Sequence, residues 1–273
     1  MRTSFHTATL HELPVLDAVQ ALLYAGYDAV ELNAETLPWA APHVGPDTPI
    51  DVRQQLRATG AISSIAAHRP GLASMNDDER REAIDWTVGC IQLASDVRAP
   101  VVHVIPGDQP DLGTGLGVAS EPGNLHAFVA SLREIVDAAD GTGVVVALEP
   151  IVNQLVSTTD QTLAILEAVP GLKVSFDPSH LQVTTHDVHD AALRLGPHTV
   201  IAAIKDARGE PTDFAFLAQG RGEIDFLDMV DTLRASGFDG ALVVEHEAHL
   251  FGDTRSPDQV VRESLPGARA LAS

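Results

Sequence analysis

The sequence predicts an α/β protein, a (β/α)8 TIM barrel formed by one domain that spans residues 1–273. Three observations support this fold class. Short apolar, β-branched segments alternate with longer amphipathic ones, the alternation occurs eight times, and no linker or low-complexity tract divides the chain. Strands that alternate with helices pair in parallel. Eight such units in 273 residues fit a closed barrel, which commonly needs about 250 residues.

The predicted strands are runs of Val, Ile, Leu and Ala that are too short to be helices. In chain order they are "RTSFHT" (2–7), "AVELNA" (29–34), "ISSIAAH" (62–68), "VVHVIPG" (101–107), "VVVALEP" (144–150), "LKVSFDP" (172–178), "VIAAIKD" (200–206) and "ALVVEHE" (241–247).

The segments between them repeat apolar residues at three- and four-residue spacing, which is typical of helices with one buried face. They include "LDAVQALLYAG" (16–26), "ERREAIDWTVGCIQLASDVR" (79–98), "HAFVASLREIVDAADGTG" (126–143), "TDQTLAILEAVPG" (159–171) and "FLDMVDTLRASGFDG" (226–240). Several end in glycine just before the next strand, which suits a helix C-cap.

The alternative fold is a doubly wound open sheet, which usually carries a phosphate-binding turn after an early strand. "GTGLG" (113–117) looks superficially like such a turn. It follows a loop containing Pro106 and Pro110, however, and not a strand. We therefore favour the closed barrel.

Composition restricts the function classes. The chain has 17 Lys plus Arg against 38 Asp plus Glu, a formal charge of −21. Nucleic-acid binding depends on cations that neutralise phosphates, so this charge argues against it. The single cysteine, Cys90, excludes an intrachain disulfide, the N-terminus lacks an apolar signal segment, and no run of 18 apolar residues is present. We expect a soluble, cytoplasmic protein without nucleic-acid or membrane partners.

Ionisable residues gather at the C-terminal ends of the predicted strands, where active sites of (β/α)8 barrels form. One such residue alone is usually a strand cap or an ion-pair partner, but many at one rim require charge compensation, which a divalent cation supplies. The set comprises Glu31, Asn33, His68, His103, Glu149, Asp177, Lys205, Glu245 and Glu247, with His6 in the first strand.

Three of these carboxylates, Glu149, Asp177 and Glu245, come from the fifth, sixth and eighth strands. Three oxygen ligands with room for water and substrate suit Mn²⁺ or Mg²⁺, and an added imidazole admits Zn²⁺ or Co²⁺. His180 follows Asp177 in "KVSFDPSHL" (173–181), so it would hold a substrate oxygen or complete the metal shell. Its alternative role is a hydrogen bond to the loop backbone.

Four stretches carry a resemblance to a known family: "LEP" with Glu149, "FDPSH" with Asp177 and His180, "GRGEIDF" (220–226), and "GFDGALVVEHE" with Glu245. The chain resembles the xylose isomerase-like TIM barrels, the sugar phosphate isomerases and epimerases. It is similar to tagatose 3-epimerase, hydroxypyruvate isomerase and inosose dehydratase, and more distantly to endonuclease IV. The set of motifs is specific for the superfamily and not for a substrate.

The resemblance has a gap on the seventh strand, where the family places a metal-binding histidine in a His-x-Lys-Asp pattern. Lys205 and Asp206 match, but Ala203 holds the histidine position. Three outcomes are open: His180 or another histidine completes the shell, water fills the position, or metal binding is weakened or lost. We favour a retained metal, because three facing carboxylates without a cation repel one another. Lys205, on the same face as Ala203, is placed to reach into the freed space.

The remaining motif, "GRGEIDF", is interpreted as structural. In the family this loop after strand seven leads into the last helix, and Asp225 is well placed as its N-cap. Arg221 is a candidate contact for a substrate anion. Trp39 and the pair Phe214 and Phe216 would either wall the site or cover the core.

The resemblance implies a divalent-metal-dependent isomerase or epimerase acting on a small keto sugar or related polyol-ketone. Glu149 and Glu245 would approach the substrate from opposite sides and transfer a proton through an enediolate. Lys205 and His180 would orient hydroxyls, with His6, His68 and His103 as lining residues. Few basic residues stand on the rim, so we expect an unphosphorylated substrate. Family members often form dimers or tetramers, so homo-oligomerisation stays open.

Other functions fit the same parts. A lyase results if the enediolate carries a leaving group on its β-carbon, as in a dehydratase or keto-glycoside cleavage. A non-catalytic sugar-binding barrel is favoured by Ala203. An abasic-site nuclease needs a histidine-rich three-metal site and a basic face, and the charge of −21 argues against it.

Overall fold

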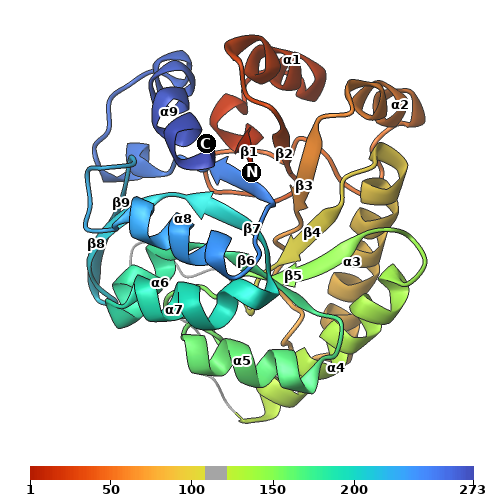
Figure 1. Ribbon diagram of the computed structural model, residues 1–273. Coiled ribbons are helices and arrows are strands. Elements are labelled where there is room, and N and C mark those ends of the chain that lie inside the picture. Colours follow the sequence, from red (N-terminus) through yellow and green to blue (C-terminus); the bar gives the residue numbers. More distant parts are fainter. Residues whose placement is uncertain (108–121) are drawn as a thin grey trace.

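Eight parallel strands form the centre of the structure and helices surround them, as the sequence predicts (Figure 1). The computed structural model describes residues 1–107 and 122–273, so the predicted "GTGLG" stretch lies outside the described residues. The strands are β1 (Arg2–Phe5), β2 (Val30–Asn33), β3 (Ile62–Ala66), β4 (Val101–Val104), β5 (Val145–Leu148), β6 (Lys173–Phe176), β7 (Thr199–Ile204) and β10 (Ala241–Val244). All eight predicted strands are confirmed. The polar residues predicted at their C-terminal ends lie in the last residues of a strand or shortly after it.

Hydrogen bonds join the strands in the order β1-β10-β7-β6-β5-β4-β3-β2. Every pair in this series is parallel, with Phe5 beside Val244 at one junction. A parallel bridge between His6 and Glu31 then connects the end of β1 to β2. The ring is therefore closed, and the protein is a (β/α)8 TIM barrel.

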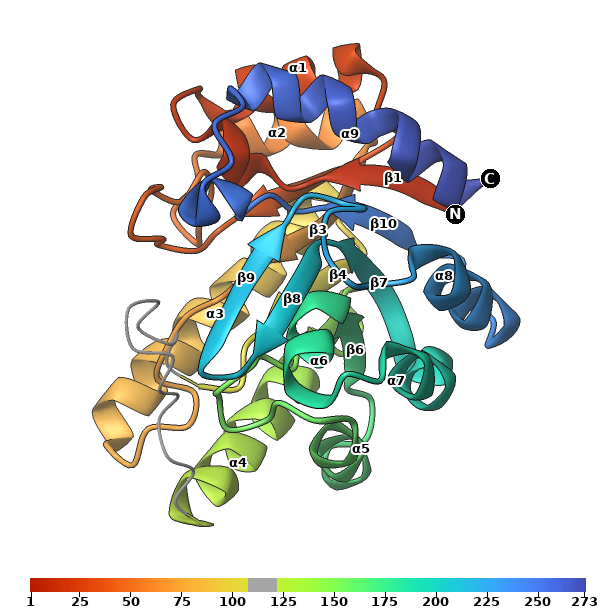
Figure 2. The same cartoon turned by 90° about the vertical axis from the view of Figure 1, so that its left-hand side faces the viewer.

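The helices lie outside this ring, and α6 and α7 both follow β6 (Figures 1 and 2). They are α1 (Val15–Ala25), α2 (Ile50–Thr59), α3 (Asp77–Val97), α4 (Pro122–Ala139), α5 (Thr159–Ala168), α6 (Pro178–Thr185), α7 (Val188–Leu195), α8 (Phe226–Ala235) and α9 (Pro257–Ala272). Within the described part of the chain, none of them combines the length and the apolar character that crossing a membrane requires.

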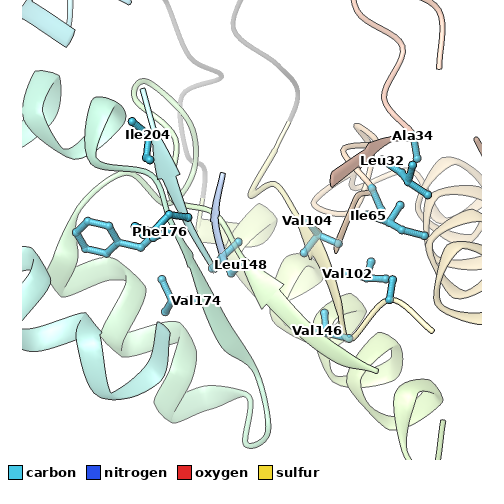
Figure 3. Close-up of a cluster of buried hydrophobic side chains, with 14 of the residues drawn as sticks. Leu32, Ala34, Ile65, Val102, Val104, Val146, Leu148, Val174, Phe176 and Ile204 are labelled. Atoms are coloured by element: carbon cyan, nitrogen blue, oxygen red, sulfur yellow. The ribbon is translucent and has the colours of Figure 1, made fainter. Parts of the chain in front are cut away.

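Strand residues alternate between two cores, because successive side chains of a strand point to opposite faces. Figure 3 shows side chains of the outer core, which lies between strands and helices and includes Leu32, Ile65, Val102, Val104, Val146, Leu148, Val174, Phe176 and Ile204. A smaller core fills the barrel and contains Val101, Ala147, Ile201, Ala241 and Val243. The same alternation turns His103, Glu149 and Asp177 toward the barrel interior.

The segment after β7 differs from the prediction. It forms an antiparallel hairpin of β8 (Asp206–Glu210) and β9 (Asp213–Leu217), which Figure 2 shows beside α6. The pairing of the two strands depends on Gly209 of β8, which lies opposite Phe214; its φ is +97°, and a Cβ there would lie 2.2 Å from the carbonyl oxygen of Asp213. The "GRGEIDF" segment (220–226) after the hairpin leads directly into a helix, as expected, but that helix is α8 and not the last one, because β10 and α9 follow it.

The Asp206 side chain holds the "GRGEIDF" segment, which follows the hairpin, through hydrogen bonds to its backbone. Its buried carboxylate accepts backbone N–H groups from Ala207 (2.9 Å), Gly222 (2.8 Å) and Ile224 (3.2 Å). A Cβ on Gly222 would lie 2.3 Å from Asp206 Oδ1, so only glycine permits this approach. The prediction that Asp225 caps the following helix is confirmed, since its side chain accepts the backbone N–H of residue 228. The motif is therefore structural.

Replacing Asp206 with alanine is expected to lower the free energy of unfolding by about 3 kcal/mol or more, because three backbone donors lose a charged acceptor. Urea denaturation followed by circular dichroism measures this. Asp213→Ala, on the exposed part of the hairpin, is the matched control, with an expected change within about 0.5 kcal/mol. Equal losses in the two variants would contradict the structural role of Asp206.

Candidate active site

The C-terminal ends of the strands surround a hollow that we call the mouth. Parallel strands end at the same edge of the sheet, so residues that directly follow them meet there. Polar and aromatic side chains of the mouth are Glu35, His68, Glu149, Gln154, His180, Lys205, Phe214, Phe216, Glu245 and Glu247. The free space between them is only about 50 Å³. The mouth is thus a narrow, highly charged pocket.

A buried network of histidines and glutamates occupies the side formed by β2 to β5. His103 Nε2 lies 2.9 Å from Glu31 Oε2, and His103 Nδ1 lies 3.0 Å from Glu149 Oε2. His68 Nε2 lies 3.1 Å from His103 Nδ1 and 3.5 Å from Glu149 Oε2. On its other side, His68 Nδ1 lies 3.1 Å from Glu35 Oε2. Each imidazole therefore stands between two carboxylates.

These contacts raise the pKa values of the two histidines and lower that of Glu31. Burial opposes the charged form of His103, but Glu31 and Glu149 raise its pKa to about 9. The carboxylates of Glu35 and Glu149 likewise hold the pKa of His68 well above its ordinary value against burial. Burial would raise the pKa of Glu31, yet His103 and a Ser64 hydroxyl lower it to about 2. The network is accordingly a set of paired charges.

Lys205 occupies the opposite side, formed by β6, β7 and β10. Its ammonium lies 2.8 Å from Asp177 Oδ2, 3.2 Å from Glu245 Oε2 and 3.1 Å from Glu247 Oε2. The Lys205 side chain is 2% exposed, whereas those of Glu245 and Glu247 are 20% and 16% exposed. Burial opposes its charge, but the three carboxylates hold the pKa of Lys205 well above its ordinary value. Lys205 and Asp177 thus form the floor of the mouth, and the two glutamates its edge.

The "FDPSH" motif orients Asp177 and His180 through a helix cap. Asp177 is the N-cap of α6, and its Oδ1 accepts the backbone N–H of Ser179 at 2.7 Å. Its second oxygen, Oδ2, is thereby turned toward Lys205 and toward His180 Nε2, which lies 3.5 Å away. His180 Nε2 is also 3.8 Å from Glu149 Oε1, and burial lowers the pKa of this imidazole. One oxygen of the Asp177 carboxylate therefore caps α6, and the other faces the mouth.

Two overlapping groups of side chains have ligand atoms close enough to hold a metal ion. Glu149, Asp177 and His180 form one group, and His68, His103 and Glu149 form the other, with ligand atoms within 4.8 Å of one another in each. Two carboxylates with one imidazole suit several divalent ions. Ala203 supplies no ligand from β7, and Lys205 shares Asp177 Oδ2 with the first group. The residues present fit a metal ion, with His180 in the set.

The structure brings together seven of the predicted site residues: Glu149, Asp177, Glu245, His180, Lys205, His68 and His103. His6 lies close by, buried beside Glu31, and burial lowers its pKa to about 4. Arg221 is exposed and lines a different hollow together with Phe251 and Arg255. Trp39 packs edge-on against His11 and His249 and is not part of the mouth lining, whereas Phe214 and Phe216 are.

Two polar residues of the mouth, Glu35 and Gln154, were not predicted. Both lie in loops beyond the strand ends, where neither periodicity nor a motif marks them. Both are buried. Glu35 Oε1 and the two polar atoms of the Gln154 amide have no hydrogen-bond partner among the described residues. Buried polar atoms of this kind are costly unless a ligand pairs with them.

The sequence pattern of the family described as "Xylose isomerase-like TIM barrel" matches residues 19–271. The chain belongs to this family. L-ribulose-5-phosphate 3-epimerase UlaE of Escherichia coli (strain K12) is 25% identical over 215 residues, which are 76% of this chain and 72% of that epimerase. The proteins to which this chain is similar thus include a sugar epimerase.

Solved structures agree on the fold. D-psicose 3-epimerase from Clostridium cellulolyticum H10, solved with D-tagatose, is 17% identical with a TM-score of 0.77, and all of both chains is covered. The IolI protein, solved with a zinc atom, is 18% identical with a TM-score of 0.79, covering 100% of this chain and 98% of that one. At these identities the likeness concerns the barrel alone.

Proposed function

We propose that this protein is a divalent-metal-dependent isomerase or epimerase that acts on an unphosphorylated keto sugar or related polyol-ketone by proton transfer. The observation that carries the proposal is the convergence of Glu149, Asp177 and His180 in one mouth, with Glu245 at its edge. The names of the similar epimerases, which act on ketoses, support the same class of reaction.

Glu149, Asp177 and His180 are the proposed metal-holding residues, with Glu245 completing the set. When bound, a divalent ion supplies Lewis-acid chemistry that polarises the ketone oxygen of the substrate. Carboxylate ligands favour Mn²⁺ or Mg²⁺, and the His180 imidazole extends the choice to Zn²⁺ or Co²⁺. His180 thereby takes the place that Ala203 leaves open.

Glu149 and Glu245 are the proposed proton-transfer residues. One carboxylate takes the proton from the carbon next to the ketone, and the electron pair of that C–H bond becomes the enediolate. The other returns a proton, to the opposite face for an epimer or to the neighbouring carbon for an isomer. The buried walls of the mouth exclude water during this transfer.

The charges of the mouth favour an uncharged substrate. Lys205 is the permanent cation among the described lining residues, and three carboxylates already pair with it. A phosphate group entering this pocket would be repelled by several glutamates, with no lining cation free to pair with it among the described residues. We therefore place the substrate among neutral ketoses, in contrast to the phosphorylated sugar in the name of the Escherichia coli relative.

Removing metal from the purified protein is expected to lower its activity on ketohexoses by about 100-fold or more, and Mn²⁺ is expected to restore it. The assay is incubation in D2O followed by NMR, in which deuterium enters next to the ketone without loss of water or of a substituent. Elemental analysis of the same samples gives the metal content, and His180→Ala is expected to reduce it.

Each alternative function predicts a different result. Full activity in protein without metal would contradict the metal-dependent mechanism. Release of water or of a glycosyl group would indicate a lyase, and sugar binding without deuterium uptake would indicate a binding protein.

A further inference from the structure

A second hollow, which we call the side chamber, adjoins the mouth between the loops that follow β2 and β3. Its volume is about 960 Å³, and it extends to α2 and α3, which lie side by side in Figure 1. Small-molecule sites commonly span about 300–1,000 Å³. The mouth, with about 50 Å³, is below this range, and the side chamber is near its upper end. A substrate whose ketone reaches Glu149 must therefore extend out of the mouth.

Glu35 and His68 line both hollows and so mark the place where they meet. The His68 ring alone separates Glu35 from Glu149, since its two nitrogens lie 3.1 Å and 3.5 Å from the two carboxylates. A ligand that contacts Glu35 is consequently separated from Glu149, the residue proposed to transfer the proton, by the His68 ring alone.

Hydrogen bonds position Glu35 and leave one of its carboxylate oxygens without a partner among the described residues. Its backbone N–H donates to Asn33 Oδ1 at 3.0 Å, and the Asn33 amide donates back to its carbonyl at 3.1 Å. The side chain is buried, with Oε2 facing His68 and Oε1 without a hydrogen-bond partner among the described residues. Such an acceptor is compensated by a donor such as a hydroxyl group.

The lining of the side chamber selects against anions. Its acidic side chains are Glu35, Asp47, Glu79 and Glu82. Arg69 is the permanent cation among the described lining residues. It pairs with Glu82, and its guanidinium lies 5.4 Å from the centre of the Trp86 ring. Apolar surface from Trp86 and Val52 faces the same space. Acceptors beside apolar surface suit a neutral polyol, whose hydroxyls donate and whose C–H groups pack.

We propose that the side chamber binds the non-reacting sugar unit of a neutral glycosylated ketose, with Glu35 accepting a hydroxyl at the junction. This inference rests on the proposed function, which places the ketone of the same molecule at Glu149 and Glu245. It makes the preferred substrate a disaccharide-sized ketose instead of a free hexose.

The test compares D-fructose with isomaltulose, a glucosyl-fructose that keeps a free ketone, by calorimetric titration of the metal-loaded protein. Isomaltulose is expected to bind about 10-fold more tightly. Val52→Phe, which narrows the chamber from α2, is expected to remove this difference and to leave the fructose Kd unchanged. Thr36→Phe narrows it independently from an exposed loop position, and Gln54→Phe on the exposed face of α2 is the matched control.

Binding is also followed by fluorescence in a Trp39→Phe background, where Trp86, in the chamber wall, is the remaining tryptophan of the two in the chain. Isomaltulose is expected to change the emission and fructose is not. Equal affinity for both sugars would overturn the inference, and so would a preference for isomaltulose that survives both narrowing variants. Spermidine, a polycation, tests whether the acidic lining selects a cation instead. Tighter binding of spermidine than of isomaltulose would also overturn the inference. If deuterium exchange on fructose persists in those cases, the proposed function stands alone. If neither sugar binds or exchanges, both proposals fail.

Discussion

Replacing Glu149 with glutamine is expected to reduce ketose turnover by about 1,000-fold or more. Proton transfer by a positioned side chain commonly contributes about 10²–10⁴-fold, and glutamine cannot accept the proton. Glu149 also belongs to both groups of candidate metal ligands, so the metal content of the variant is expected to fall. Deuterium exchange measured by NMR, together with elemental analysis of the same sample, provides both numbers.

Two further variants separate catalysis from structure. Glu12→Gln makes the same chemical change at an exposed position and is expected to retain full activity. Glu245→Gln leaves the contacts of His68 and His103 intact and leaves Lys205 paired with Asp177 and Glu247, so it is expected to lose turnover to a similar degree while keeping the melting temperature. Retention of more than a tenth of the activity in Glu149→Gln would contradict its proposed role.

The barrel itself could be predicted because the evidence for it is local. Alternating apolar residues define each strand, and parallel strands place the residues that follow them at one rim. Glu149, Asp177, Lys205 and Glu245 were therefore predictable as neighbours, and the structure places Lys205 within 3.2 Å of Asp177 and Glu245. The capping role of Asp225 was also local, since a helix begins immediately after it.

The remaining parts depend on contacts that the sequence does not encode locally. The β8–β9 hairpin lacks a strong apolar alternation and is held partly by packing against α6. Glu35 and Gln154 lie in irregular loops, and their burial results from segments distant in sequence. Arg221 belongs to a predicted motif, but the hairpin and Asp206 direct that motif away from the mouth. Side-chain direction in such loops follows from tertiary packing alone.

Replacing Lys205 with methionine is expected to lower the free energy of unfolding by about 3–5 kcal/mol, because removing one partner leaves buried charges of one sign uncompensated. Asp177, Glu245 and Glu247 would then share a site without a cation. A divalent ion can supply that charge, so the stability of the variant is expected to become metal-dependent. At a Mn²⁺ concentration about 100 times the Kd, linkage returns about 2.7 kcal/mol.

Urea denaturation with and without Mn²⁺ measures both effects. Lys173→Met, which alters the only other lysine of the chain, is the matched control; Lys173 is half-buried on β6, and its loss is expected to change stability by less than about 0.5 kcal/mol with no added response to metal. A Lys205 variant as stable as the native protein would contradict the counter-ion role. Turnover shows whether Lys205 has a second role. In the Lys205 variant, Mn²⁺ replaces only the charge of the ammonium group. If Mn²⁺ restores stability but not turnover, the ammonium also contacts the substrate.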